Sequence, residues 1–429
     1  MKSSAIIFLL IIGSITLKQS YSQNIWTEEN SGVSVQLNSI ACFSNSRAWC
    51  CGNNGTVLKR LPVPSLWTNV GGNGIPSAID LVNITSPSSG DTNIALTTGT
   101  INDTTYVYRT TNSGANWVKV FSQLNGRINA ILFPSVFSNT NVFMQGNPVG
   151  GRWSLWKSTN GGLNWDSAGL YLPQSGVETG WNNSMYYSGG STLSFGTNNS
   201  RIYYSTNSGT SWSVQSTSPE INIYTIFFQP GPTVSFSGGS ALLKSTNYGV
   251  NWLPNPSIGS GNFGGLAGFY SSYWWYVRSD NKIYLSGNNG SSWVAQYTAP
   301  AGIYTHLFFW SNTYLIYAVR SNGGISRYLI VVGVNQISSE VPNEFSLSQN
   351  YPNPFNPTTN FEFQIAKSGF VNLTIYDVMG REIESLVKGD LKPGTYEADW
   401  NASNFPSGIY FYTLRTTGYT ETKRMVLIK

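Results

Sequence analysis

A short turn sequence recurs five times along the chain, and its repetition constrains the fold more than any other feature. It has the form small-x-Asn-x-Gly-x-polar-Trp. The Asn side chain can close a turn on its own backbone, the Gly permits a positive φ, and the Trp opens the next strand with a large apolar group. We call these segments the Asn turns and predict that each is structural. Their repeated residues are Asn112, Gly114 and Trp117; Asn160, Gly162 and Trp165; Asn207, Gly209 and Trp212; Asn247, Gly249 and Trp252; and Asn288, Gly290 and Trp293.

The repeated Trp residues are about 40 to 50 positions apart, and Trp67 and Trp26 extend the series towards the N-terminus. A period of this length, with about four short strands in each unit, is typical of propeller blades. The last unit supplies only three strands, so we expect the segment around Trp26 to complete it. The sequence therefore predicts an all-β fold, with a seven-bladed propeller over residues 23–335.

The Asn turns resemble the Asp-box, or BNR, repeats of sialidases, sortilin-type receptors and related propellers. The segment from Leu37 to Lys59 is similar to a blade of propellers related to the photosystem II assembly factor. That family usually has Asp where this chain has Asn, and either side chain can cap the turn. The resemblance implies that the turns lie on the face away from the usual ligand site.

Residues 336–349 lose Trp and Gly and are predicted to be a linker, and residues 350–429 then form a small Ig-like β-sandwich from six short strands. Four motifs in this segment resemble the C-terminal sorting domain of type IX secretion cargo from Bacteroidetes-like bacteria. The resemblance implies that the type IX outer-membrane translocon is a partner of residues 350–429. The motifs are Tyr351–Pro357, Tyr376–Arg381, Pro406–Tyr412 and Lys423–Lys429.

Residues 1–22 have the features of a secretory signal peptide: a charged start at Lys2, an apolar stretch, and the small-x-small site Ser20-Tyr21-Ser22. No later segment is a candidate membrane span. We therefore expect an exported protein, extracellular or at the outer-membrane surface. Only 10% of residues are charged and the basic ones are scattered, which argues against nucleic-acid binding.

The three cysteines are Cys42, Cys50 and Cys51. An odd number in an exported chain leaves at least one unpaired. A disulfide between Cys42 and Cys50 is possible across a hairpin, but we favour small buried strand residues.

No pattern of catalytic residues is present. Nine acids lie between Gln23 and Gln336, without a spacing that singles out a pair, and His306 opens a strand without a partner motif. We predict no catalytic residue, no metal site and no cofactor, and favour a non-enzymatic protein. A glycoside hydrolase or lyase remains an alternative, and would need facing carboxylates such as Glu178 with Asp280 or Asp80. An assembly factor for an envelope complex is a second alternative.

A binding surface for a protein or a glycan is expected on the loops opposite the Asn turns. Aromatic groups beside polar groups on one face suit such ligands. The other interpretation is that the aromatic residues fill gaps between blades. The candidate ligand-binding residues are Tyr171, Glu178, Trp181, Trp274, Arg278, Asp280 and Arg320.

Overall fold

The computed structural model describes residues 26–44, 47–60, 66–87, 93–134, 139–228, 234–269, 272–310, 315–329, 334–402 and 405–429. The chain divides into two compact units, Ile25–Leu329 and a second that contains Ile330–Lys429. Every regular element in the described ranges is a strand. The predicted signal peptide lies outside these ranges.

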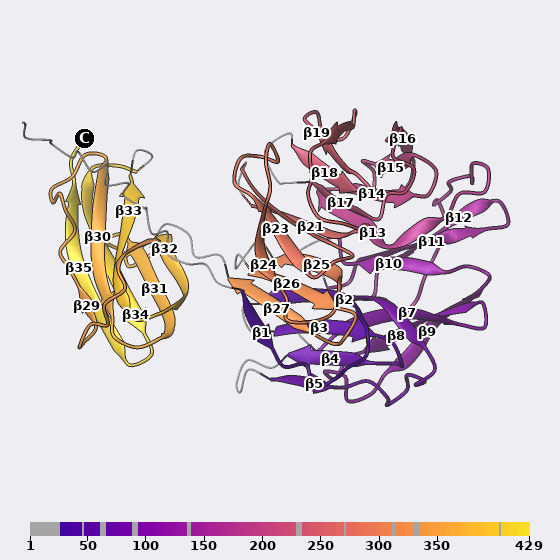
Figure 1. The fold of residues 1–429 in the computed structure, drawn as a ribbon, viewed down its shortest axis with the longest axis horizontal. Coiled ribbons are helices and arrows are strands. Elements are labelled where there is room, and N and C mark those ends of the chain that lie inside the picture. The colour runs from indigo at the N-terminus through magenta and orange to yellow at the C-terminus, as the bar shows by residue number, and fades with distance from the viewer. Residues whose placement is uncertain are drawn as a thin grey trace, which may run out of the picture. The chain divides into compact units, whose positions relative to one another are not determined.

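The described residues of the first unit form seven antiparallel sheets in chain order (Figure 1). The first sheet contains β2 (Leu37–Ser44), β3 (Arg47–Gly52), β4 (Val57–Arg60) and β5 (Trp67–Asn69). The second contains β6 (Asp80–Thr85), β7 (Ala95–Ile101), β8 (Thr104–Thr110) and β9 (Val118–Leu124). The third contains β10 (Ile128–Leu132), β11 (Val142–Val149) and β12 (Arg152–Ser158).

The remaining four sheets of this unit continue the series. The fourth contains β13 (Gly180–Gly189), β14 (Thr192–Thr197), β15 (Arg201–Ser205) and β16 (Ser213–Ser216). The fifth contains β17 (Thr225–Phe228), β18 (Ser235–Gly238), β19 (Leu242–Ser245) and β20 (Leu253–Asn255). The sixth contains β21 (Phe263–Phe269), β22 (Tyr273–Arg278), β23 (Lys282–Ser286) and β24 (Val294–Thr298). The last contains β25 (Tyr304–Trp310), β26 (Leu315–Arg320), β27 (Ile325–Leu329) and β1 (Thr27–Glu29).

The first strands of successive sheets lie side by side around a common axis, and β25 returns to lie beside β2. Figure 1 shows the sheets radiating from this axis as in a propeller. The predicted all-β propeller is therefore confirmed. Aromatic residues pack between neighbouring sheets; for example, Trp49 of β3 meets the edge of Trp117 with ring centroids 5.9 Å apart.

The ring closes with a strand from the N-terminal end of the unit. Strand β1 pairs antiparallel with β27, with Thr27 opposite Arg327 and Glu29 opposite Ile325. The last sheet thus contains three strands from the end of the propeller and one from its beginning. The sequence predicted this arrangement, because the unit after Trp293 supplies only three strands and the segment around Trp26 can provide the fourth.

The five Asn turns share one set of hydrogen bonds. In the turn at Asn160, the amide Oδ1 accepts from the Asn164 N–H and the Ser158 hydroxyl, both at 2.9 Å. The Gly162 N–H donates to the same hydroxyl, and Gly162 has a φ of 80°. Asn112, Asn207, Asn247 and Asn288 make the same contacts. These bonds join the third strand of a sheet to the segment opened by the Trp.

The third sheet departs from the repeat. We expected Trp165 to open a fourth strand, but among the described residues the next segment forms only two isolated bridges, Lys157 with Asp166 and Arg152 with Pro173. Between them the chain leaves the sheet in a turn, where Asp166 Oδ1 accepts from the Ala168 N–H at 2.8 Å. This excursion interrupts regular pairing with β12.

All three cysteines are buried, and none of them forms a disulfide. In the register of β2 and β3, Cys50 lies opposite Ile40, and Cys42 lies opposite Ala48. The two cysteines are therefore offset along the hairpin, and the disulfide considered from the sequence is not formed.

The second unit is a sandwich of two sheets around one apolar core that includes Phe361, Leu373, Trp400 and Tyr412. One sheet has the order β28 (Val334–Ser338), β33 (Gly394–Asn401), β30 (Thr358–Ile365) and β29 (Ser346–Leu347). The other has the order β32 (Glu382–Leu391), β31 (Gly369–Tyr376), β34 (Gly408–Thr416) and β35 (Tyr419–Leu427).

The segment 336–349, expected to be a linker, contributes to this sandwich. Strand β28 begins before it and pairs with β33, and β29 pairs with β30. Both are short edge strands, and polar residues in β28 such as Gln336 and Ser338 hide them from a search for apolar alternation.

An axial cavity as candidate functional site

A cavity of about 300 Å³ lies on the propeller axis. Its walls come from the first strands of all seven sheets: β2, β6, β10, β13, β17, β21 and β25. These strands are the most enclosed parts of the ring, so the cavity is positioned by the propeller scaffold itself. A concave site of this kind is a common place for ligands in folds of this shape.

The cavity lies towards the side that carries the Asn turns. Its lining comes mainly from the second halves of the first strands, such as Tyr187 in β13 and Trp310 at the end of β25. In an antiparallel four-stranded sheet, the end of the first strand and the turn between the third and fourth strands lie at the same edge. The loops that we expected to bind ligand lie at the opposite edge.

Aromatic side chains form the outer part of the cavity. Phe133 follows β10, Tyr187 lies near the end of β13, and Phe308 and Trp310 lie near the end of β25. Phe133, Tyr187 and Phe308 are only half-buried, so they present ring surface to the cavity. Rings of this kind can contact an apolar side chain or the apolar face of a sugar.

Two amides form the floor of the cavity. Asn83 Nδ2 donates to Asn183 Oδ1 at 2.8 Å, and Asn183 Nδ2 donates to the carbonyls of Asn38 and Val82 at 3.1 and 3.2 Å. The remaining amide oxygen, Asn83 Oδ1, accepts from the Ile131 N–H at 2.9 Å. The bonds of Asn183 join β13 to β2 and β6, which belong to sheets that are not its neighbours in the ring. Asn183 therefore spans the axis and closes the inner end of the cavity.

The local backbone explains how Asn183 reaches the axis. The pairing of β13 with β14 shifts register between Gly180 and Met185, which marks an irregular stretch around Asn183. Asn183 itself has a φ of 62°, in the left-handed region that Asn tolerates better than most residues. The irregularity turns its side chain inward.

His306 lies in the wall of the cavity. Its Nδ1 accepts from the Ile40 N–H at 3.3 Å. Burial lowers the pKa of His306 to about 4, because the charged ring would lose its hydration. The ring is therefore neutral near pH 7, and with Nδ1 as the acceptor its proton is on Nε2. His306 can then serve as a neutral hydrogen-bond donor but not as a cation.

Three of the predicted ligand-binding residues, Tyr171, Glu178 and Trp181, lie after β12 and up to the second residue of β13, and each has different surroundings. Tyr171 is 64% exposed. Glu178 is buried and accepts from Trp153 Nε1 at 3.1 Å and from the Tyr203 hydroxyl at 2.6 Å. Trp181 packs on Tyr224 with ring centroids 4.6 Å apart. Glu178 thus acts as an internal anchor of the third and fourth sheets.

The predicted residues Trp274 and Arg278 of the sixth sheet also have partners inside the fold. Trp274 is fully buried, and its Nε1 donates to Asn289 Oδ1 at 3.1 Å. Arg278 is buried over the Phe263 ring and donates to the carbonyls of Gly261 and Ser240 at 2.8 and 2.9 Å. The position of Trp274 corresponds to the expected alternative, in which aromatic residues fill gaps between blades.

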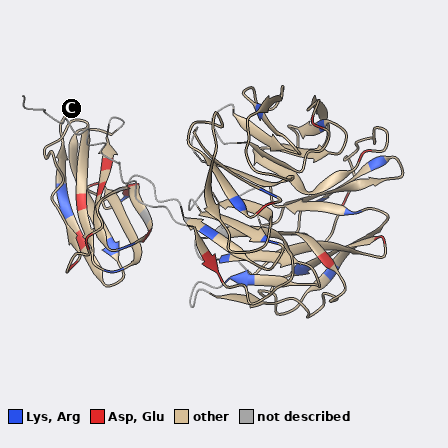
Figure 2. Cartoon of the chain, in the orientation of Figure 1, with Lys and Arg blue, Asp and Glu red and all other residues tan. Residues whose placement is uncertain are grey.

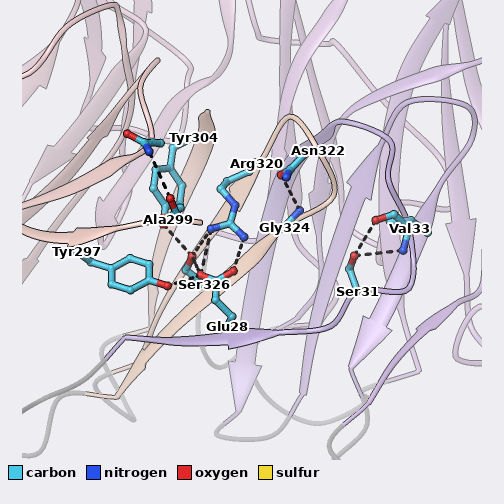
Figure 3. Close-up of polar contacts among 11 residues, drawn as sticks. Glu28, Ser31, Val33, Tyr297, Ala299, Tyr304, Arg320, Asn322, Gly324 and Ser326 are labelled. Carbon is cyan, nitrogen blue, oxygen red and sulfur yellow. Dashed lines mark hydrogen bonds and ion pairs between the residues drawn. The ribbon is translucent and has the colours of Figure 1, made fainter. Parts of the chain in front are cut away.

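Asp280 and Arg320 belong to polar networks. Asp280 Oδ2 accepts from the Tyr284 hydroxyl at 2.7 Å. Arg320 is buried and forms an ion pair with Glu28 of β1, and Ser326 and Tyr297 donate to the same carboxylate (Figure 3). None of the seven predicted ligand-binding residues lines the axial cavity.

Sequence reasoning did not identify the axial cavity. The signal that could have found it is the recurrence of aromatic residues at the ends of the first strands, such as Phe133, Tyr187 and Phe308. An alignment of the repeats on their first strands, instead of on the Asn turns, would have placed these residues around one axis.

Charged groups are sparse in the propeller, and Figure 2 shows Lys and Arg in small patches that are separated from one another along the strands. Within the described ranges, no group of three or more His, Cys, Asp or Glu is placed to hold a metal ion. The same ranges contain no helix with the length and apolar character needed to cross a bilayer.

The second unit is similar in sequence to a known domain family. Residues 349–429 match the secretion system C-terminal sorting domain. We refer to these residues as the sorting domain. A type IX sorting domain implies export of the chain, to the cell surface or the medium, and handling by that secretion system. Comparison with curated proteins gave no match.

Solved structures similar to this chain support the propeller fold. YCF48 bound to D1 peptide is 16% identical, with a TM-score of 0.55, and the match covers 72% of this chain and 99% of YCF48. YCF48 from Cyanidioschyzon merolae gives 16% identity, a TM-score of 0.55, and coverage of 71% and 98%. The GH74 enzyme from Niastella koreensis gives 14% identity, a TM-score of 0.52, and coverage of 81% and 59%. At these identities the likeness concerns the fold alone.

Proposed function

We propose that the protein is an exported, non-catalytic binding protein whose propeller receives a large apolar side chain of a protein ligand in the axial cavity. The observation that supports this proposal is the aromatic outer wall above a floor of fully hydrogen-bonded amides. Such a floor has no strongly charged group to attract an ion or to perform acid–base chemistry. The outer wall instead offers ring surface that a ligand can cover.

The size of the cavity favours a small inserted group. About 300 Å³ is at the lower end of the usual range for ligand pockets, enough for a large side chain or one sugar ring. We favour a peptide segment because the neutral His306 and the aromatic rings complement an apolar side chain and its backbone. One propeller of similar fold, YCF48, was solved with a peptide bound. An envelope assembly factor would be one setting for such binding.

The positions of the acids do not favour glycoside hydrolysis. That reaction needs two carboxylates on either side of the scissile bond. Eight of the nine acids from residue 23 to 336 lie in the described ranges, and none of the eight lines the axial cavity. Asp91 lies outside those ranges. Glu178, one member of the pairs considered above, is buried in contact with Trp153 and Tyr203.

The test compares two tyrosines on opposite faces of the propeller. The mature full-length chain is screened against peptide and glycan arrays, and Tyr187→Ala and Tyr171→Ala are then measured against the best binder. Tyr187 lines the cavity, so we expect Tyr187→Ala to weaken binding by about tenfold or more. Tyr171 lies away from the cavity lining and serves as the matched exposed control, with binding unchanged.

Other outcomes separate the alternatives. Loss of binding in Tyr171→Ala with retention in Tyr187→Ala would place the ligand on the loops that the sequence indicated. Binding to glycans instead of peptides would keep the cavity but change the ligand class. Release of reducing ends from a polysaccharide would overturn the non-catalytic assignment.

A further inference from the structure

The four sorting-domain motifs, which are far apart in the sequence, meet at one end of the sandwich. Strand β31 ends at Tyr376, which lies opposite Phe411 near the start of β34. Strand β34 starts at Gly408, which lies opposite Leu427 at the end of β35. Phe355 of the proline-rich motif also bridges to Leu427. The motifs thus define one surface, which we call the motif end.

The proline-rich motif has a structural role in the sandwich. Strand β35 is the outer strand of its sheet, and this motif covers its free edge. Asn353 Oδ1 accepts from the Val426 N–H, Phe355 N–H donates to the Val426 carbonyl, and Ile428 N–H donates to the Phe355 carbonyl, each at 3.0 Å. Covering an exposed strand edge prevents pairing with other chains.

The aromatic residues of the third motif also have structural roles in the sandwich. Tyr410 packs on Trp400 with ring centroids 5.4 Å apart, and its hydroxyl donates to the Pro406 carbonyl at 2.8 Å. The Tyr412 hydroxyl accepts from the Asn350 N–H and donates to the Ser348 carbonyl, at 2.8 and 2.9 Å. These side chains fix the third motif in the core of the sandwich and bind the segment just before the proline-rich motif.

The side chains of Val378 and Met379 in the second motif take no part in the hydrogen bonds of its turn. Asp377 accepts from the Met379 and Arg381 N–H groups, both at 2.9 Å, and from Arg381 Nε at 2.7 Å. Gly380 supplies the positive φ of 75°. The side chains of Val378 and Met379 are 64% and 77% exposed, held outward by a well-bonded turn.

Further apolar side chains are exposed at the same end. Ile409 is the second residue of β34 and Ile428 follows β35, and both are substantially exposed. The neighbouring charges are mixed, with Arg381 and Arg424 against Glu382. Exposed apolar residues from three separate motifs on a small exported domain indicate an interaction surface, and the mixed charges leave apolar contact as its main attraction.

We infer that the motif end is the surface by which the secretion machinery holds the chain, and that Val378 and Met379 enter an apolar recess of that machinery. The proline-rich and aromatic motifs build and protect this end, while the turn at Asp377 presents the two side chains. The occupant is a component of the export apparatus, because the sorting domain implies handling by that apparatus. This inference is independent of the ligand proposed for the propeller.

The test uses the full-length precursor in a bacterium with a type IX secretion system. The double variant Val378→Ser/Met379→Ser is compared with Phe370→Ser, an exposed apolar residue at the opposite end of β31. We expect the double variant to reduce the protein outside the cell at least tenfold, with accumulation in the periplasm. Phe370→Ser should be exported like the parent, and Met379→Leu should retain export because it remains apolar.

Purified full-length variants are also unfolded thermally to separate recognition from folding. The motif-end substitutions lie on exposed side chains, so the melting temperature should be unchanged. Normal export of the double variant would overturn the inference. An equal loss of export in Phe370→Ser would also overturn it, since the effect would then not be confined to the motif end. If the melting temperature of the double variant is lowered, the export of the single variant Met379→Gln is measured instead. Normal export of Met379→Gln would contradict the inference.

Discussion

At the scale of single residues, Asn183 has the largest effect on the shape of the axial cavity. Its amide joins β13 to β2 and β6 and so closes the inner end. An Asn in a strand is unremarkable in sequence, and its inward direction follows from the irregular pairing of β13 with β14. Such a shift of register is a property of two strands together, which is why the sequence of β13 alone does not reveal it.

His306 permits a prediction about pH. Its folded pKa of about 4 is below the ordinary value of 6.5, so between these values the unfolded chain binds more protons than the folded chain. The contribution of the neutral ring to the free energy of unfolding is therefore fully present above about pH 6.5. It is lost as the pH falls towards 4. We expect His306→Gln, which keeps an acceptor for Ile40, to lose less stability than the parent between pH 7 and 5.5.

Urea unfolding at those two pH values measures this difference. The window is above the range in which carboxylates titrate, so their contribution is small in both proteins. Identical losses in the parent and in His306→Gln would contradict the assignment of a neutral ring.

The predicted ligand-binding residues show what residue-level reasoning lacks. Glu178 and Trp274 were predicted to lie on a ligand-binding surface, yet both have specific internal partners, Tyr203 and Asn289. Those partners are distant in sequence and belong to neighbouring segments of the fold. Side-chain partners of this kind become visible only once the sheets are placed.

At the scale of elements, the Asn turns are the most predictable parts of the chain, because their chemistry is local. Asn160→Ala removes the acceptor of two hydrogen bonds and should destabilise the propeller by about 1 kcal/mol. Asn160→Asp keeps the acceptor and should cost much less. Asn164→Ala, at an exposed position of the same turn, is the matched control.

Chemical unfolding of the full-length chain measures these three variants. Equal effects of Asn160→Ala and Asn164→Ala would show that the shared hydrogen bonds contribute little. Edge elements were harder to predict than turns: β28 and β29 are short and partly polar, and the segment after Trp165 pairs only at two bridges. Their pairing depends on neighbours and not on their own pattern.

At the scale of the whole molecule, the propeller depends on the contact between β1 and β27. Glu28 joins Arg320, Ser326 and Tyr297 across this closure (Figure 3). Glu28→Gln leaves the buried Arg320 without its counter-charge, so we expect a loss of about 1–3 kcal/mol, reduced by the partial exposure of Glu28. Asp103→Asn, at an exposed turn position, is the control and should change stability little.

The pH dependence of this closure has the usual sign for a carboxylate. Burial opposes ionisation of Glu28, but the hydrogen bonds from Arg320, Ser326 and Tyr297 outweigh it and hold the pKa below its ordinary value of 4.5. Its contribution is present above about pH 4.5 and is lost as the pH falls through the lower folded pKa. The difference in stability between the parent and Glu28→Gln should therefore shrink below pH 4.5. A constant difference down to pH 3 would contradict the ion pair.

The closure also sets the order in which the chain can mature during synthesis. Arg320 leaves the ribosome 292 positions after its partner Glu28. Until then, the first and last sheets each lack a neighbour, and their strands offer open edges to any other chain nearby. A nascent propeller therefore remains an open arc while the intervening sheets are made, and its ring can close only once β27 is available to pair with β1.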